Sequence, residues 1–224
     1  MRSSFKSDYG DIAHLLYVPI DETLLQALVQ YWNPPYSCFT FGSVDLTPTI
    51  EEYSSLINCS KIDNDRIYSK SNKNKHFRRK LERLLGALPS WVEDQVAKNN
   101  QKEYLKWEGI LALASASPGG QVQRDMLAFL IYGLVIFLKA LGHINVSVID
   151  LSDRSSGGIN PVPLILEETF RTLKFCKRNG GRFQGCSQLL TVWFHSHMWT
   201  DAKLSRSLYD GHFSPLEEFL RKED

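Results

Sequence analysis

The sequence has few cysteines, no apolar run as long as a membrane span and none of the short motifs of common catalytic sites. Its 224 residues include four cysteines at wide, irregular spacing with no CxxC pair, which disfavours a zinc knuckle or a thioredoxin-type redox site. GxSxG, HExxH, Walker and GxGxxG motifs are absent as well. The N-terminal residues lack the apolar region of a secretory signal. We therefore expect reduced cysteines in a nuclear or cytoplasmic protein.

The sequence also has no large excess of charge of one sign, because 26 basic residues are balanced by 25 acidic ones. This balance disfavours a protein whose whole surface binds nucleic acid or anionic lipid, although a local basic patch is compatible with it. Hydrophobic residues make up 43% and charged residues 23% of the chain, which is ordinary for a globular protein. No repeat or linker stands out, so the sequence predicts a single domain over residues 1–224.

Helical patterns dominate, and the sequence predicts an all-α fold that is mainly helical, with a small β-hairpin near residues 38–46. Asp21 is expected to cap one helix, and Thr47 with Pro48 to open another. Polar stretches at 61–75 and 150–158 are expected to be loops. The predicted helices cover residues 9–16, 22–32, 49–57, 76–85, 90–98, 104–114, 121–141, 160–177 and 184–199, with a last one from 214.

The helix at 121–141 is expected to be the buried centre of the fold. Its residues 126–138 are apolar on every side, which is typical of a core helix or a membrane span. This run of 13 residues is shorter than the roughly 18 residues that a span needs, so we predict a core helix and no membrane partner. Gly133 indicates either a closely packed neighbouring helix or a tolerated glycine. Helices 160–177 and 184–199 carry apolar stripes and are expected to pack on it.

Residues that could serve an enzyme are scattered. His195 and His197 point about 200° apart on a helix and cannot share a metal ion there, and His197 is expected to be a satisfied interior histidine. Asp150 and Asp153 share a helical face but are more simply explained by helix termination or solvation. Glutamate pairs such as Glu51-Glu52 fit the first turns of helices, where they complement the helix dipole. We therefore predict no catalytic, metal-binding or cofactor-binding residue, and no enzyme.

One basic cluster is the candidate functional site. It lies between Lys70 and Arg83 and is typical of a nuclear import signal or a weak nucleic-acid contact. The alternative is a solvated loop that runs into a charged helix face. A second basic group, from Lys174 to Arg182, lies at a helix C-terminus, where the helix dipole favours cations. The candidate residues of the first cluster are Lys73, Lys75, Arg78, Arg79, Lys80 and Arg83.

Five segments of the sequence form a recognisable combination, namely 31–33, 39–42, 46–53, 131–137 and 189–197. Together they resemble an uncharacterised plant domain family related to the plant mobile domain, a transposon-associated module sometimes labelled aminotransferase-like. The resemblance extends from about Ser3 to Leu220 and implies a helical domain of transposon ancestry, with nuclear relatives linked to silencing and genome maintenance. It carries over no catalytic residue, and no lysine here has a recognisable cofactor-binding context. Longer relatives continue past this end, so a C-terminal truncation is expected.

Three functional hypotheses follow from the sequence. The first is a non-enzymatic nuclear domain that binds an unknown protein partner or nucleic acid. The second is an inert relic of a mobile element. The third is an enzyme whose site is assembled from scattered residues such as Asp150, Asp153, His195 and His197. A deep polar pocket with converging ionisable groups would favour the enzyme, whereas an exposed apolar patch or a basic face around Arg78 would favour the binding domain.

Overall fold

The computed structural model confirms a mainly helical fold. It describes residues 2–59, 76–99, 102–117, 119–137, 143–155 and 157–198, together with the backbone of 63–67. The helices are α1 (Arg2–Tyr9), η1 (Ile12–Leu16), α2 (Glu22–Tyr31), α3 (Ile50–Ile57), α4 (Phe77–Leu85), α5 (Pro89–Gln95), α6 (Trp107–Ala116), α7 (Gln121–Ile131), η3 (Tyr132–Ile136), α8 (Ser147–Ser155), α9 (Val162–Asn179) and α10 (Ser187–Met198). The strands are β1 (Trp32–Asn33), β2 (Cys38–Phe41), β3 (Val44–Leu46), β4 (Asp63–Ile67), β5 (Val96–Asn99), β6 (Lys102–Lys106), β7 (His143–Asn145) and β8 (Ile159–Asn160).

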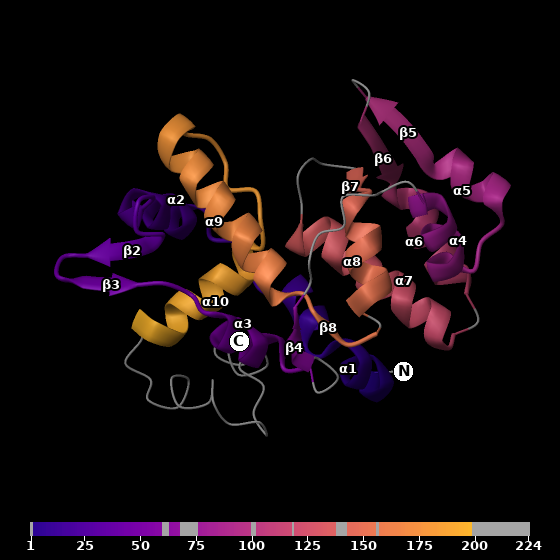
Figure 1. The fold of residues 1–224 in the computed structure, drawn as a ribbon, viewed down its shortest axis with the longest axis horizontal. Helices are drawn as coiled ribbons and strands as arrows, with labels where there is room; N and C mark the ends of the chain where they lie inside the picture. The colour runs from indigo at the N-terminus through magenta and orange to yellow at the C-terminus, as the bar shows by residue number, and fades with distance from the viewer. Residues whose placement is uncertain are drawn as a thin grey trace.

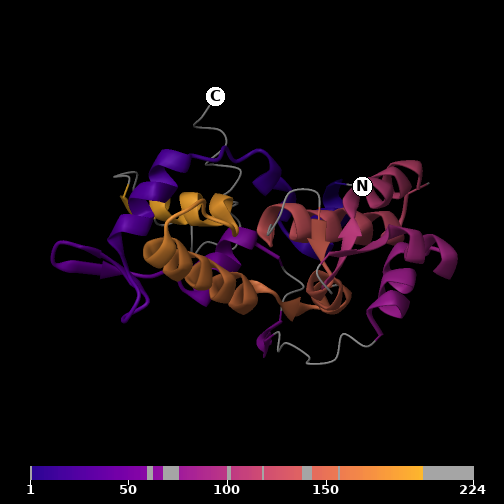
Figure 2. The same ribbon diagram turned by 90° about the horizontal axis from the view of Figure 1, so that it is seen from above.

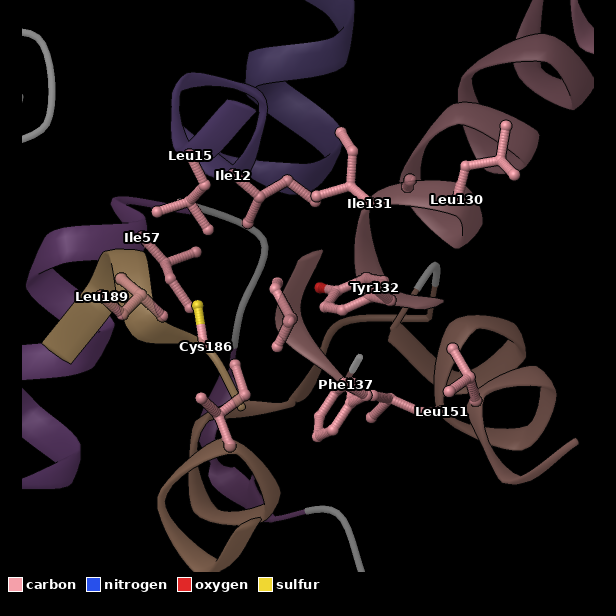
Figure 3. Close-up of a cluster of buried hydrophobic side chains, with 14 of the residues drawn as sticks. Ile12, Leu15, Ile57, Leu130, Ile131, Tyr132, Phe137, Leu151, Cys186 and Leu189 are labelled. Carbon is pink, nitrogen blue, oxygen red and sulfur yellow. The ribbon is translucent and has the colours of Figure 1, made fainter. Parts of the chain in front are cut away.

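These elements are arranged in two halves, which can be followed in Figures 1 and 2. One half holds α2, α3, α9, α10 and the sheet β1–β2–β3, and the other holds α4 to α8 and the sheet β5–β6–β7. The parallel pair β4–β8 lies where the halves meet. Buried apolar side chains nevertheless form one cluster across both halves. Figure 3 shows Ile12 and Leu15 of η1 between Ile57 of α3 and Ile131 of α7.

The predicted hairpin is confirmed as β2 and β3, which pair antiparallel around a turn at Gly42 (φ +64°). Asp21 caps α2 as predicted, because its side chain accepts a hydrogen bond from the amide of Leu24. The predicted cap of α3 was wrong. Thr49, not Thr47, is the N-cap, and it forms a capping box with Glu52.

Three local predictions were wrong where distant pairing decides the structure. Residues 96–98 and 104–106 were predicted to be helical but lie in β5 and β6, which pair with each other and, through β6, with β7. The polar stretch 150–158 was predicted to be a loop but begins within α8, whose Val148, Ile149 and Leu151 are buried. The predicted helix 9–16 is replaced by the 3-10 helix η1 (Ile12–Leu16), and the preceding α1, which ends at Tyr9, was not predicted. The predicted helix from 214, and most of the predicted loop 61–75, lie outside the described residues.

The central helix is shorter than predicted. Regular α7 ends at Ile131, continues as the π-helical turn η3 and leaves helical geometry at Phe137. Its most extensive neighbours are α4, α6, α8 and η1, whereas α9 and α10 pack mainly on α2 and α3, so its predicted partners were wrong. A Cβ atom on Gly133 would lie 2.6 Å from Cγ2 of Ile144. The close neighbour is therefore strand β7. In the described part of the chain, no helix has the length and apolar character needed to cross a membrane.

Candidate functional site

An open pocket of about 700 Å³ lies between α1 and η1 on one side and α6, α7 and η3 on the other. Its first wall is set by the turn at Gly10, which has φ +66°. A side chain there would lie 2.2 Å from the carbonyl oxygen of Ile57, so only glycine allows η1 to approach α3 this closely. The Asp11 amide then donates to that carbonyl at 2.6 Å. This contact fixes the direction of η1.

The 3-10 geometry of η1 separates core residues from pocket residues, because side chains three positions apart are eclipsed. Ile12 and Leu15 are fully buried against the core. Ala13 and Leu16, one position later, line the pocket. Leu16 is 57% exposed and Tyr17 is 67% exposed, so the rim of this wall is apolar and open to solvent.

The opposite wall is also apolar. Trp107 and Leu111 lie one turn apart on α6, and Leu111 is 40% exposed. Leu127, Ile131 and Leu134 continue the wall along α7 and η3 with the spacing i, i+4, i+7 of one helix face. Both walls thus present apolar side chains to the pocket, and each wall has a solvent-accessible rim.

A small polar group closes one side of the pocket. The Asp11 side chain is 1% exposed, and its Oδ1 lies 3.0 Å from Lys6 Nζ and 3.7 Å from His14 Nδ1. Its other oxygen accepts a hydrogen bond from the Asn58 amide at 3.2 Å. A buried carboxylate needs such partners, because removing an unpaired charge from water is costly. Lys6 and the Asn58 side chain therefore compensate the buried Asp11 carboxylate.

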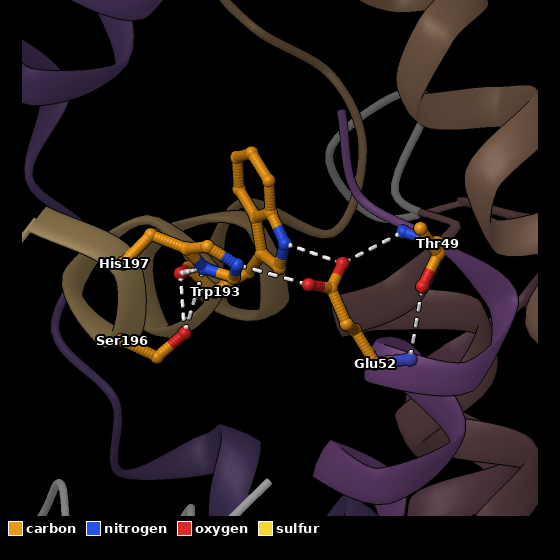
Figure 4. Close-up of polar contacts among 5 residues, drawn as sticks. All are labelled: Thr49, Glu52, Trp193, Ser196 and His197. Atoms are coloured by element: carbon orange, nitrogen blue, oxygen red, sulfur yellow. Dashed lines mark hydrogen bonds and ion pairs between the residues drawn. The ribbon is translucent and has the colours of Figure 1, made fainter. Parts of the chain in front are cut away.

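A second polar network joins α3 to α10 (Figure 4). One oxygen of Glu52, Oε2, accepts hydrogen bonds from the Trp193 indole and the Thr49 amide, each at 2.9 Å. The other, Oε1, lies 2.9 Å from His197 Nε2. His197 Nδ1 lies 2.9 Å from the carbonyl oxygen of Trp193, so both ring nitrogens face acceptors. Only the imidazolium form donates to both, and the geometry therefore favours charged His197.

Electrostatics at this network agree with the geometry. Burial alone would raise the pKa of Glu52, but hydrogen bonds from His197, Thr49 and Trp193 outweigh it and lower the pKa from 4.5 to about 2. The hydrogen bond to Glu52 raises the pKa of His197. The His197 side chain is 24% exposed and lies beside Trp193, as the sequence predicted, with ring centroids 4.9 Å apart.

The sequence-predicted basic cluster is largely engaged in ion pairs. On α4, Arg78 contacts Glu93 at 2.5 Å and Glu103 at 2.8 Å. Lys80 pairs with Asp150, and Arg83 pairs with Asp153 at 2.5 Å. Arg79 is exposed, and Lys73 and Lys75 lie outside the described residues. Carboxylates thus compensate three of the four described cations, and a role of this cluster in nucleic-acid binding or nuclear import stays a prediction.

The residues of the enzyme hypothesis do not share one set of contacts. Asp150 and Asp153 lie on α8 and bind the cations of α4, in one half of the molecule. His195 and His197 lie on α10 in the other half, where His197 binds Glu52. Within the described ranges, no three His, Cys, Asp or Glu residues are placed to hold a metal ion.

Sequence reasoning missed the pocket and the connecting role of Glu52. The pocket combines residues 3–17 with residues 107–135, and no local pattern links them. Glu52 carries the capping-box signal, which accounts for its backbone contacts but gives no sign of a partner 141 positions away.

The chain was also compared with known proteins. A family model described as "Domain of unknown function (DUF7745)" matches residues 1–214. No curated protein and no solved structure matches the chain.

Proposed function

The chain belongs to the DUF7745 family, a domain of unknown function, and we propose that it is a non-enzymatic interaction domain that binds an amphipathic segment of a protein partner in the α1–α7 pocket. The observation that carries this proposal is the pair of apolar walls with exposed rims at Leu16, Tyr17 and Leu111. Covering exposed apolar surface stabilises a complex by roughly 25 cal/mol per Å².

The shape of the pocket favours a protein segment over a small molecule. Sites for small ligands enclose about 70–90% of the ligand surface, whereas rim side chains here are 40% to 67% exposed. Two helical walls with an open side match the helix-in-groove mode, in which an amphipathic helix inserts apolar residues at i, i+3 or i+4 and i+7. The ion pair of Lys6 with Asp11 supports a binding role over catalysis, because it compensates the buried carboxylate at the polar side of the pocket.

Nuclear location and transposon ancestry belong to the same proposal. They are supported by the resemblance to the plant mobile domain, and they would make the partner a nuclear protein. The exposed apolar rim is the feature that favours a working interaction domain over an inert relic, because solvent-exposed clusters of large apolar side chains are typical of interaction sites.

Selection of peptides from a displayed random library against the purified protein tests this proposal. We expect selected peptides to carry apolar residues at helical spacing, and fluorescence anisotropy to show binding that Leu16→Glu and Leu111→Glu each weaken by about tenfold or more, since a buried charge without a partner is costly. Leu88→Glu is the matched control, because Leu88 is 73% exposed and does not line the pocket. Failure to select any peptide, or equal binding by all three variants, would contradict the proposal.

A further inference from the structure

The outward face of α9 carries three cations around one aromatic ring. Arg171, Lys174, Phe175 and Arg178 are all exposed, and their spacing of i, i+3, i+4, i+7 places them on one side of the helix. The opposite side, with Thr169, Thr172, Leu173 and Cys176, is buried against the protein. The C-terminal end of α9, which carries these residues, lies at the periphery of the molecule in Figure 1.

Phe175 contributes little to packing. Its side chain is 57% exposed, whereas every other phenylalanine whose burial the structure describes is buried or half-buried. Single exposed apolar residues are common on proteins. The distinguishing feature here is the position of the ring between cations, one turn from both Arg171 and Arg178.

The cations on this face and around the C-terminal end of α9 fall into two groups. Arg171 pairs with Glu168, Arg182 with Glu22, and Lys177 donates to the carbonyl of Gln30 at 2.5 Å. Lys174 and Arg178 have neither an ion pair nor a side-chain hydrogen bond among the described residues, in contrast to the compensated cations of α4.

The face as a whole is positive. Its cations are Arg171, Lys174 and Arg178, and only Arg171 has a carboxylate partner among the described residues, Glu168. The helix dipole explains why cations are tolerated at the end of α9, but it does not explain an exposed phenylalanine among them.

We propose that this face of α9 binds single-stranded nucleic acid, with a base stacked on Phe175 and phosphates bound by Lys174 and Arg178. An aromatic platform flanked by cations is the common device for single strands, because every unpaired base offers a π-face and every nucleotide a phosphate. A duplex keeps its bases stacked on one another and offers no ring to Phe175. A membrane is less suitable, because insertion uses the apolar side of an amphipathic helix, and that side of α9 is buried.

The proposal is separate from the peptide-binding pocket, because the pocket is built from α1, η1, α6, α7 and η3. The test is fluorescence anisotropy of the full chain with a fluorescein-labelled 20-nucleotide oligothymidylate at 50 to 300 mM salt. Phe175→Ala is expected to weaken binding about tenfold with an unchanged salt slope, because it removes one stacked base. Lys174→Ala/Arg178→Ala is expected to make the log–log salt slope shallower by about 1.4, because each phosphate contact on a single strand contributes about 0.7.

Matched controls use side chains of the same kinds elsewhere. Tyr36→Ala removes an aromatic ring that is 78% exposed, and Lys98→Ala/Lys106→Ala removes two exposed cations of β5 and β6. Both are expected to bind like the wild type, and circular dichroism melts verify that all variants fold. Absence of oligonucleotide binding, equal loss in the controls, or wild-type binding by Phe175→Ala would overturn the proposal. Preference for a 20-base-pair duplex, or for phosphatidylserine vesicles in sedimentation, would overturn it as well.

Discussion

Glu52 is the residue at which local and long-range structure meet. Its carboxylate completes the capping box of α3 with Thr49 and also accepts hydrogen bonds from Trp193 and His197 of α10. Hydrogen bonds to a charged group contribute about 1.5–3 kcal/mol each. A single side chain therefore both starts one helix and fixes a second helix against it.

Glu52→Gln tests whether the charge at this position stabilises the fold. Glutamine preserves the capping box but removes the ion pair. His197 has a raised pKa in the folded state, so its contribution is fully present below about pH 6.5 and is lost as the pH rises through the folded pKa. Glu52 has a pKa of about 2 against 4.5, so its contribution is present above pH 4.5 and is lost towards pH 2.

We therefore expect Glu52→Gln to lower the free energy of unfolding by about 1–3 kcal/mol near pH 5.5 and by clearly less near pH 8.5. Urea unfolding at both pH values measures this difference. Glu51→Gln is the control, because Glu51 is exposed in the same helical turn, and it should have a small effect at either pH. An equal loss of stability by Glu52→Gln at the two pH values would show that charge is not the cause.

At the scale of elements, the close contact between η3 and β7 depends on a glycine, Gly133, because glycine has no side chain. Gly133 lies inside helical structure, where alanine would normally be preferred by about 1 kcal/mol. The close approach of Ile144 reverses this preference, because an added Cβ atom would lie 2.6 Å from Cγ2 and 2.9 Å from Cγ1 of that residue.

Gly133→Ala is accordingly expected to destabilise the protein by about 1–3 kcal/mol through overpacking. Ile144→Ala removes Cγ1, Cγ2 and Cδ1, the atoms that the added Cβ atom would meet, so Gly133→Ala should cost clearly less in that background. A double-mutant cycle by thermal or urea unfolding measures this coupling. Strictly additive effects of the two substitutions would mean that the strain is relieved elsewhere.

Elements with strong periodic or capping signals could be predicted from the sequence. The Asp21 cap, the hairpin β2–β3 and α9 are examples, because their patterns depend on residues close in the chain. Strands β5 and β6 could not be predicted, because β6 pairs with β7 about 40 positions away. Helix α8 could not be predicted either, because its polar residue Asp150 is stabilised by Lys80 of α4. Tertiary partners overrode local propensity in these cases.

The candidate sites also combine features that depend on nearby residues with features that depend on distant partners. The basic residues of α4 could be identified from composition, but the carboxylates that compensate them come from α5, β6 and α8. The pocket depends on the turn at Gly10 and on walls that are about 100 residues apart in sequence. Neither the compensation nor the pocket has a signal within a single segment.

For the whole molecule, the N-terminal segment connects the two halves. Asp8 pairs with Arg124 at 2.9 Å, and the Tyr9 hydroxyl donates to Asp125 at 2.6 Å, which ties α1 to α7. Two residues later the Asp11 amide donates to Ile57 of α3, in the other half. Together with the continuous apolar cluster, these contacts make unfolding of one half costly for the other, because each half would expose buried surface shared with its neighbour.

We therefore expect the two halves to unfold in one cooperative transition. In the variant Trp91→Phe/Trp107→Phe/Trp199→Phe, the remaining tryptophans, Trp32 and Trp193, report on the half that holds α2 and α10. Its urea midpoint by fluorescence should coincide with its midpoint by far-UV circular dichroism, which reports on all helices. Adding Tyr9→Phe removes the hydrogen bond between Tyr9 of α1 and Asp125 of α7. We expect it to lower the free energy of unfolding by about 0.5–1.5 kcal/mol and to shift both urea midpoints down together. Separate midpoints, or a shift of only one of them, would show that the halves are independent folding units.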